Sequence, residues 1–267
     1  MSQPAVRLVV KVGTSTLTHD TGAMNLQRMD HLCRTLSDLK NRGLEVILVT
    51  SGAIAVGVSR LGLHARPRAL PMKQAAAAVG QCELMHLYDK LFAEYGQAMG
   101  QILLTREDVA DSLRRDHLNG TFLSLLDLGV IPVVNENDSV SAAEIESGRG
   151  RVFGDNDTLS AVVAELVQAD LLVLLTDIDA VYDRDPHLDG AQPIREVRAL
   201  TDQLWQAASG AGSSRGTGGM LTKFQAAEIC MKAGIDMVVA SGADPELLFD
   251  IVAGKPVGTR FLGRVLP

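Results

Sequence analysis

Two lysines and several aspartates stand at positions where they could act on a phosphate group. Lys11 follows a short apolar run, and Lys223 follows the glycine-rich segment 216–219 in the first turn of a helical pattern. Glycine-loop amides and helix N-termini receive phosphate oxygens. The candidate anions are Asp138, Asp155, Asp157 and Asp177. Cations, free amides and carboxylates able to hold magnesium suit phosphoryl transfer, because its transition state spreads negative charge over the transferred group.

Alternating patterns along the chain predict the elements that position these residues. Short apolar runs rich in β-branched residues occupy 6–10, 45–49, 100–104, 130–134, 171–175 and 236–240. Longer helical patterns lie between them, at 25–43, 70–96, 118–129, 157–169 and 221–234. The runs are apolar on both faces, which is typical of parallel strands buried under two layers of helices. The chain is therefore predicted to be an α/β protein wound in right-handed crossovers.

Polar and small residues follow nearly every predicted strand. In an open α/β sheet, ligands bind beyond the carboxyl ends of the strands. The five segments found there are KVGTS (11–15), TSGAIAVG (50–57), NENDS (135–139), TDIDAVYDRDP (176–186) and SGADPE (241–246). In the second of these, Ser51 is a candidate helix cap and Gly52 lets a ligand approach the backbone. Five such strand ends together predict one ligand site.

Composition and charge limit the function classes. The chain has 267 residues, 46% of them hydrophobic, and a net charge of -7, which gives no basic footprint for nucleic acid or acidic membranes. Its apolar runs are too short to span a bilayer, and its start shows no export signal. Three separated cysteines fit a reducing compartment. We expect one cytoplasmic domain over 1–267.

The common nucleotide motifs are missing from the sequence. There is no Walker-type G-x-x-x-x-G-K-[ST], no G-x-G-x-x-G after a predicted strand, and no protein-kinase HRD and DFG pair. Nucleotide use therefore has to come through another architecture.

An ordered set of motifs resembles the glutamate 5-kinases of the amino acid kinase superfamily. The motifs are VVKVGTSTL (9–17), VTSGAIAVG (49–57), VIPVVNENDSV (130–140), FGDNDTLSA (153–161), LLTDIDAVYDRDP (174–186) and GTGGMLTK (216–223). The resemblance runs from about residue 6 to about residue 262. It implies a three-layer αβα sandwich around a mainly parallel open sheet of about eight strands. It also implies that ATP, with Mg²⁺, phosphorylates the side-chain carboxylate of L-glutamate for proline biosynthesis.

The same resemblance implies a role for each residue in the matching motifs. Lys11 and Lys223 would neutralise the transferred phosphoryl group, and Asp157 would hold both lysines. The residues implied to bind glutamate are Ser51, Asp138 and Asn156, with the amides of Gly52 and Ala53 facing the reacting carboxylate. The residues implied to hold ATP are Lys11, Thr176, Asp177, Thr217, Gly218, Gly219, Met220, Leu221, Thr222 and Lys223. No metal-binding side chain is assigned.

The resemblance also bears on partners and regulation. It implies a homodimer or homotetramer, proline as a feedback inhibitor, and no nucleic acid or membrane partner. The segment 143–153 is longer than we expect for this family, which bears on the glutamate pocket and on proline inhibition. We expect no C-terminal RNA-modification-type (PUA) domain.

Other interpretations of these residues remain open. The glycine-rich segment could be a mobile surface loop and Lys11 a solvated strand end. Asp155 and Asp157 could cap the helix expected near Thr158, and Asp177 could only form a turn. Two rival functions follow: a sister kinase acting on another carboxylate or on carbamate, and a non-catalytic amino acid or nucleotide sensor on a kinase fold.

Overall fold

Six runs of valine, leucine and isoleucine form the centre of one sheet. The computed structural model describes residues 6–19, 22–141, 156–184, 190–202, 204–205 and 219–263. Its main sheet consists of β1 (Arg7–Val12), β2 (Glu45–Val49), β3 (Met99–Leu104), β4 (Ile131–Glu136), β5 (Leu171–Thr176), β8 (Glu196–Val197), β9 (Asp236–Ser241) and β10 (Thr259–Phe261). A separate hairpin pairs β6 (Val181–Tyr182) with β7 (Pro193–Ile194).

The eight strands of the main sheet lie in the order β3-β4-β2-β1-β5-β9-β10-β8. All neighbouring strands are parallel except β10, which runs antiparallel to β9. β1 is central: β2 pairs with one edge and β5 with the other. Parallel strands of this kind are shielded by helices on both faces. The expected mainly parallel α/β sheet of about eight strands is therefore confirmed.

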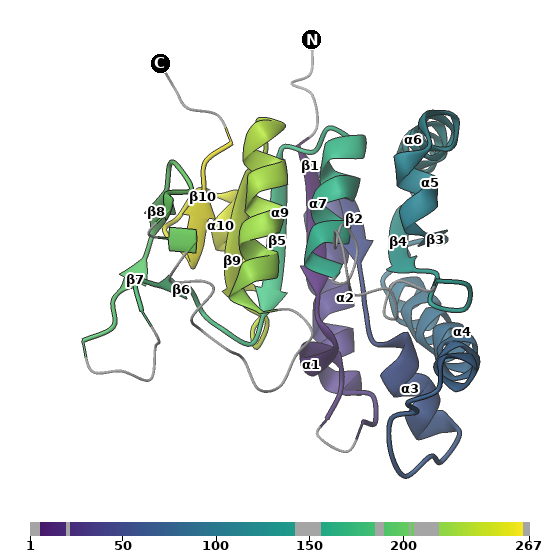
Figure 1. The fold of residues 1–267 in the computed structure, drawn as a ribbon. Helices are drawn as coiled ribbons and strands as arrows, with labels where there is room; N and C mark the ends of the chain where they lie inside the picture. Colours follow the sequence, from purple (N-terminus) through teal and green to yellow (C-terminus); the bar gives the residue numbers. More distant parts are fainter. Residues whose placement is uncertain are drawn as a thin grey trace.

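Helices cover both faces of the sheet and make a three-layer sandwich (Figure 1). They are α1 (Thr14–Leu17), α2 (Leu26–Asn41), α3 (Ala53–Arg60), α4 (Leu70–Glu94), α5 (Arg106–Ala110), α6 (Ser112–Asp127), α7 (Asn156–Leu166), α9 (Met220–Lys232) and α10 (Leu247–Val252). Side chains of α6, α7 and α9 share one apolar core with alternate strand residues such as Val9 and Leu172. Side chains of α2, α4 and α10 share the other, with residues such as Leu8 and Val173.

The predicted strands and long helices are confirmed, with some differences in extent. The helix expected from 118 starts earlier, at Ser112, because the Asp111 side chain accepts from the backbone N–H of Arg114 and caps it. The short elements β8 and β10, the β6–β7 hairpin and the helices α1, α5 and α10 were not predicted, and α3 was expected only as a helix that Ser51 would cap. Most of them contain too few residues to show a periodic pattern.

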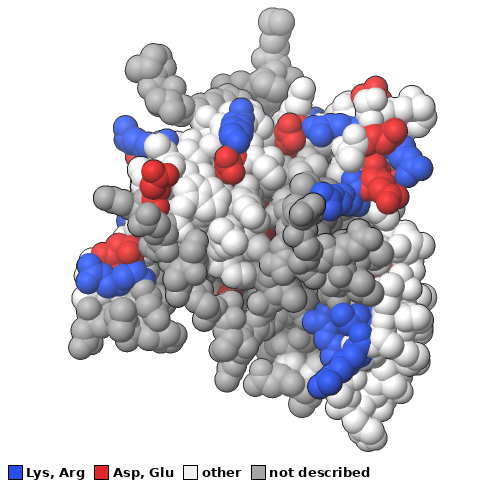
Figure 2. Space-filling model, in the orientation of Figure 1, with Lys and Arg blue, Asp and Glu red and all other residues white. Residues whose placement is uncertain are grey.

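On the face shown in Figure 2, the described residues form no continuous basic stripe. Acidic and basic side chains on this face mostly lie close to one another, and basic side chains alone gather in one small area at the lower right. This distribution agrees with the excess of acidic residues in the sequence. None of the described helices is both long and apolar enough to cross a membrane.

Helices α3 and α4 pack backbone to backbone. A Cβ placed on Gly80 of α4 would lie 1.8 Å from the carbonyl oxygen of Ala53, and one on Gly57 of α3 would lie 1.8 Å from that of Ala76. Both distances are far below any real contact, so only glycine fits at these two crossings. The close packing fixes the first turn of α3, which begins at the carboxyl end of β2.

Replacing Gly80 by alanine should therefore destabilise the protein. We expect Gly80→Ala to lower the free energy of unfolding by at least 1–3 kcal/mol, roughly the usual penalty for overpacking. Gly120 is the matched control, because it also lies inside a helix but no other atom lies within 4 Å of the position that a Cβ would take there. Gly120→Ala should raise the stability by up to about 1 kcal/mol through helix propensity. Urea unfolding of both variants measures the contrast, and equal effects would contradict this account of the α3–α4 contact.

Candidate functional site

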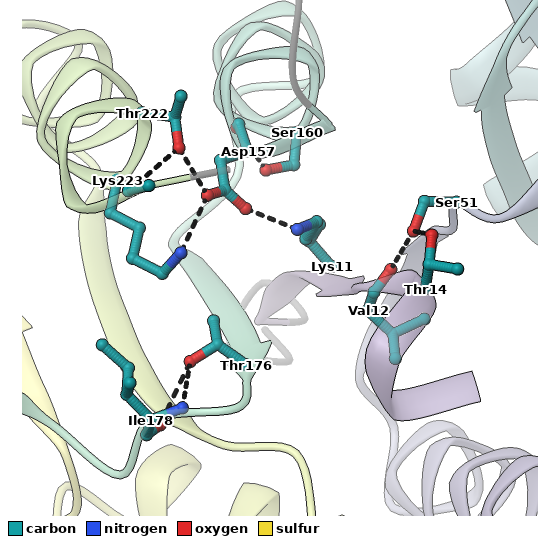
Figure 3. Close-up of polar contacts among 11 residues, drawn as sticks. Lys11, Val12, Thr14, Ser51, Asp157, Ser160, Thr176, Ile178, Thr222 and Lys223 are labelled. Atoms are coloured by element: carbon teal, nitrogen blue, oxygen red, sulfur yellow. Dashed lines mark hydrogen bonds and ion pairs between the residues drawn. The ribbon is translucent and has the colours of Figure 1, made fainter. Parts of the chain in front are cut away.

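The carboxyl ends of β1, β2 and β5 meet near the middle of the sheet. The chain leaves β1 toward β2 on one side and later returns to β5 on the other, so this is the point where the winding changes direction. Ligands of open α/β sheets bind at such switch points. Lys11, Ser51 and Thr176 lie at these three strand ends and gather around one region (Figure 3).

Asp157 lies between the two lysines that the sequence singled out. Its Oδ1 is 2.5 Å from Lys11 Nζ, and its Oδ2 is 3.3 Å from Lys223 Nζ. The hydroxyl of Thr222 lies 3.1 Å from the same Oδ2, and that of Ser160 donates to the Asp157 main-chain carbonyl at 2.6 Å. Figure 3 shows these groups converging from β1, α7 and α9. In the sequence, Lys11 lies 146 positions from Asp157, and Lys223 lies 66 positions from it.

The cluster is buried, and its charges control the ionisation of Asp157. The carboxylate side chain is 0% exposed, and those of Lys11 and Lys223 are 9% and 7% exposed. Burial by itself would raise the pKa of Asp157, but the positive charges of Lys11 and Lys223 outweigh that effect. With the hydrogen bonds from Lys11 and Thr222, they lower the pKa from 3.8 to about 2. The carboxylate is therefore ionised at neutral pH.

Such a cluster is a poor way to stabilise a fold. Moving charges out of water is costly, and an apolar replacement of a buried ion pair is often neutral or stabilising. Here two ammonium groups with little exposure to water face one carboxylate. Buried ammonium groups of this kind favour an anion in the same place. The arrangement is therefore better explained by ligand chemistry than by stability.

Two helices that begin beside this cluster start with glycine instead of a capping side chain. Gly52 precedes α3 and Gly219 precedes α9, and neither provides a side-chain hydrogen bond to the helix. By contrast, Asn25, Thr105 and Asp111 cap α2, α5 and α6 through their side chains. An uncapped helix N-terminus offers N–H groups and a partial positive charge to an anion. Both helix starts are therefore suited to phosphate or carboxylate groups.

Ser51 does not cap α3, which corrects the expectation from the sequence. Its hydroxyl donates to the carbonyl of Val12 at 3.1 Å and accepts from Thr14 Oγ1 at 3.3 Å. The cap position belongs to Gly52, whose φ of 98° lies in the left-handed region. Ser51 thus ties the ends of β1 and β2 together. It is 6% exposed, and Ala53 follows at 2% in the first turn of the helix.

The predicted nucleotide-side residues occupy two segments. Thr176 ends β5, and its Oγ1 accepts from the N–H of Ile178 at 3.2 Å, so it shapes the turn in which Asp177 is exposed. Gly219 is the N-cap of α9, and Met220, Leu221 and Thr222 form its first turn with Lys223. Met220 was expected to be a loop residue and instead starts this helix. Thr217, Gly218, Asp155 and most of the segment 135–157 lie outside the described residues.

The predicted glutamate-side residues lie near α7 and the end of β4. Asp138 follows β4 and is half-buried. Asn156 is the first residue of α7, and its buried Oδ1 has no hydrogen-bond partner among the described residues. Asp157 follows it inside the first turn, so Asp157 is not the helix cap considered above. An unpaired buried acceptor is costly unless a ligand or water donates to it.

Within the part of the chain that the structure describes, the carboxylates near the lysines form no metal site of their own. Both oxygens of Asp157 are directed at ammonium and hydroxyl groups. Among the described residues, the one group with metal-ligand spacing is His31 with Asp244 and Glu246, which lies at the surface between α2 and α10. Asp157 is therefore not a magnesium ligand in this arrangement.

Sequence reasoning missed several residues that shape the site. Thr14 was not singled out, although its hydroxyl contacts Ser51. Gln81 was also missed; the first residue of the NEND segment, Asn135, donates from Nδ2 to Gln81 Oε1 at 2.7 Å. The NEND motif pointed to Asn135 by position, but no sequence signal marked Gln81, which lies 54 residues away.

Comparisons with known proteins identify the family of the chain. Residues 6–241 match the Amino acid kinase family. The chain is 49% identical over 259 residues to a glutamate 5-kinase of Clostridium perfringens, covering 97% of this chain and 96% of that one. It is 52% identical over 255 residues to a glutamate 5-kinase of Clostridium tetani, covering 95% and 93%. Among solved structures, carbamate kinase from Giardia lamblia bound to AMP-PNP has the same fold, with a TM-score of 0.69 at 15% identity, covering 97% of this chain and 99% of that one.

The lowered pKa of Asp157 predicts how stability depends on pH. Because the folded-state pKa, about 2, lies below the ordinary 3.8, the contribution of Asp157 is present above pH 3.8 and is lost as the pH falls toward 2. At pH 7, Asp157→Asn should lower the free energy of unfolding by about 3 kcal/mol, since it removes the anionic partner from buried ion pairs. Below pH 4 the difference from the parent chain should shrink.

Urea unfolding of both chains at several pH values between 7 and 3 measures this dependence. A difference that stays constant over that range would show that the Asp157 charge contributes nothing to stability.

Proposed function

Because the chain belongs to the amino acid kinase family, we propose that it transfers the γ-phosphoryl group of ATP to the side-chain carboxylate of L-glutamate. The product is L-glutamyl 5-phosphate, an acyl phosphate, and the reaction opens proline biosynthesis. Identities of about 50% over nearly the full chain to glutamate 5-kinases support this substrate. The likeness to carbamate kinase supports the fold alone.

The buried cluster of Lys11, Asp157 and Lys223 is the observation that carries the proposal. Phosphoryl transfer gives the protein little covalent chemistry to perform, so catalysis consists of positioning and charge stabilisation. Lys11 and Lys223 neutralise the charge on the equatorial oxygens of the group in flight. Asp157 holds both ammonium groups in place. Few waters reach these side chains, so each charge acts with little screening.

The attack needs no protein base. The side-chain carboxylate of glutamate is already ionised at neutral pH, and one of its oxygens attacks the γ-phosphorus while the bond to the β–γ bridging oxygen breaks. ADP leaves with the electron pair of that bond, so no proton has to move. The amides of Gly52 and Ala53, at the uncapped start of α3, receive the reacting carboxylate.

The nucleotide is assigned to the start of α9 and the turn after β5, whereas the reacting carboxylate is assigned to the start of α3. The uncapped N-terminus of α9 supports phosphate binding by Gly219, Met220, Leu221 and Thr222, together with Thr217 and Gly218 before it. The turn that follows β5 supports a role for Thr176 and Asp177 at the nucleoside. Mg²⁺ belongs to the proposal as part of MgATP, held by phosphate oxygens, because Asp157 is occupied by the lysines; there it shields the phosphate charge.

The amino acid is assigned to the side that Ser51, Asp138 and Asn156 occupy. The unpaired Oδ1 of Asn156 is an acceptor suited to the α-ammonium group of glutamate, and the Asp138 carboxylate supplies a second acceptor. Feedback inhibition by proline, a homodimeric or homotetrameric assembly and a cytoplasmic location complete the proposal. They rest on the resemblance to glutamate 5-kinases.

Two other functions are less well supported. A non-catalytic sensor would not need two buried lysines on one carboxylate, which are costly to keep. A sister kinase acting on another acceptor is disfavoured by the high identity to glutamate 5-kinases.

The acceptor is tested directly with the purified chain, MgATP and hydroxylamine, which traps acyl phosphates as hydroxamates. We expect ADP release and hydroxamate with L-glutamate, and neither with aspartate, N-acetylglutamate, carbamate or UMP. ADP release with a different acceptor would contradict the substrate, and binding of ATP and glutamate without turnover would favour the sensor. Proline added to the same assay tests feedback inhibition.

Replacing Lys223 tests the proposed phosphate site most directly. Lys223→Ala should lower kcat by about 10²–10³-fold, the usual effect of removing one charge-stabilising donor. The fold should remain, because Asp157 keeps its contact with Lys11.

Lys232 is the matched control on the same helix. It is an exposed lysine paired with Glu228, and such pairs contribute little. Lys232→Ala should therefore keep normal turnover. Steady-state kinetics measures kcat of both variants, and circular dichroism checks that both are folded. Near-normal kcat in the Lys223 variant would remove this lysine from the mechanism.

A further inference from the structure

A cavity of about 340 Å³ opens between α4, β3 and the segment that follows β4. Its lining includes Ala53, the first residue of α3, and Asp138, so it joins the proposed site of transfer to the proposed amino acid side. Gln81 of α4 lines it as well. Gly80 packs directly on the Ala53 carbonyl, so the neighbouring Gln81 is held at a fixed place relative to the start of α3.

In the side-chain amide of Gln81, the oxygen accepts a hydrogen bond, whereas the nitrogen has no partner among the described residues. Its Oε1 accepts from Asn135 Nδ2 at 2.7 Å, and Asn135 Oδ1 in turn accepts from the N–H of Glu136 at 2.9 Å. These two bonds fix the orientation of both amides. The Nε2 of Gln81 is buried and has no hydrogen-bond partner among the described residues, although the side chain lines the cavity. A buried donor without a partner is costly, so an acceptor belonging to a ligand explains it.

The polar groups of an α-amino acid match those of Asp138 and Gln81 in this lining. Its ammonium group needs an acceptor, which Asp138 offers, and its α-carboxylate needs a donor. No lysine or arginine lies among the described residues that line the cavity. The amide of Gln81 is thus a neutral donor available to a carboxylate there. A donor placed for one group rejects analogues that lack it, because its own hydrogen bond is then lost.

We propose that Gln81 donates from Nε2 to the α-carboxylate of the phosphate acceptor and so selects acceptors that carry this group. The inference rests on the proposed function and deepens it, because it assigns the second carboxylate of L-glutamate to a residue on α4. Gln81 acts in binding and specificity, whereas Lys11 and Lys223 act on the reacting group.

Three ligands separate the groups that Gln81 and Asp138 recognise. L-Glutamate has both carboxylates and the ammonium group, glutarate lacks the ammonium group, and 4-aminobutyrate lacks the α-carboxylate. Calorimetric titration of each ligand into the chain with Mg²⁺ and AMP-PNP gives the dissociation constants. We expect Gln81→Met to weaken L-glutamate and glutarate by about tenfold, as for a lost hydrogen bond to a charged group, and to leave 4-aminobutyrate within about twofold.

A matched variant reverses the pattern. Asp138→Asn should weaken L-glutamate and 4-aminobutyrate but not glutarate. Gln81→Asn keeps an amide but withdraws it by one methylene; it should behave like Gln81→Met, and it replaces that variant if circular dichroism shows that Gln81→Met is unfolded.

The outcomes distinguish the inference from the function on which it rests. Equal weakening of all three ligands would mean that Gln81 acts only through Asn135, and unchanged binding of all three would mean that water fills the cavity beside Nε2. Either result overturns the proposal while glutamate-dependent hydroxamate formation stands. A parent chain that neither binds nor phosphorylates L-glutamate would overturn the proposed function, and the role of Gln81 with it.

Discussion

The contact of one buried carboxylate with two buried ammonium groups is the constraint on which the site depends. Asp157 comes from α7, Lys223 from α9 and Lys11 from β1, so the contact exists only when two helices and the central strand are correctly placed. Three charges out of water weaken the fold unless something compensates them. In the proposed function the ligand supplies this compensation, because buried ammonium groups stabilise the negative charge of a transferring phosphoryl group.

Other features of the fold place backbone N–H groups without side-chain caps near this cluster. Glycines replace side-chain caps at the starts of α3 and α9, which leaves N–H groups for anions. Glycines at the α3–α4 crossing let the two backbones touch, so the first turn of α3 cannot drift. Ser51 then ties the end of β2 to β1. Small residues therefore set the site geometry as much as charged ones do.

The sequence predicted the framework of the fold better than its short elements. The buried strands stood out because they are apolar on both faces, and the long helices because they are periodic. Helix α3 was expected only as a helix that Ser51 would cap, and its extent was not predicted, because its eight residues include Gly57, which has a low helix propensity and which the structure needs for contact with α4. Tertiary packing decided that case, and one sequence alone does not show it.

The resemblance predicted the residues of the central cluster and the contact of Asp157 with both lysines, but not the other contacts of the site. The motifs pointed to Lys11, Asp157 and Lys223, whereas the role of Ser51 as a cap was wrong, because the left-handed backbone at Gly52 takes that position. Gln81 has no sequence signal at all. Its unpaired donor becomes visible only when Asn135, which is remote in sequence, occupies the other end of its amide.

The two lysines also differ in how firmly their backbones are held. Lys11 lies in the central strand, registered against Val49 of β2 on one side and Leu174 of β5 on the other, so its Cα cannot move without breaking the sheet. Lys223 lies in the first turns of a helix whose N-cap contributes no side-chain bond. The site is therefore supported asymmetrically: one ammonium group extends from a strand that is paired on both sides, and the other from the start of a helix.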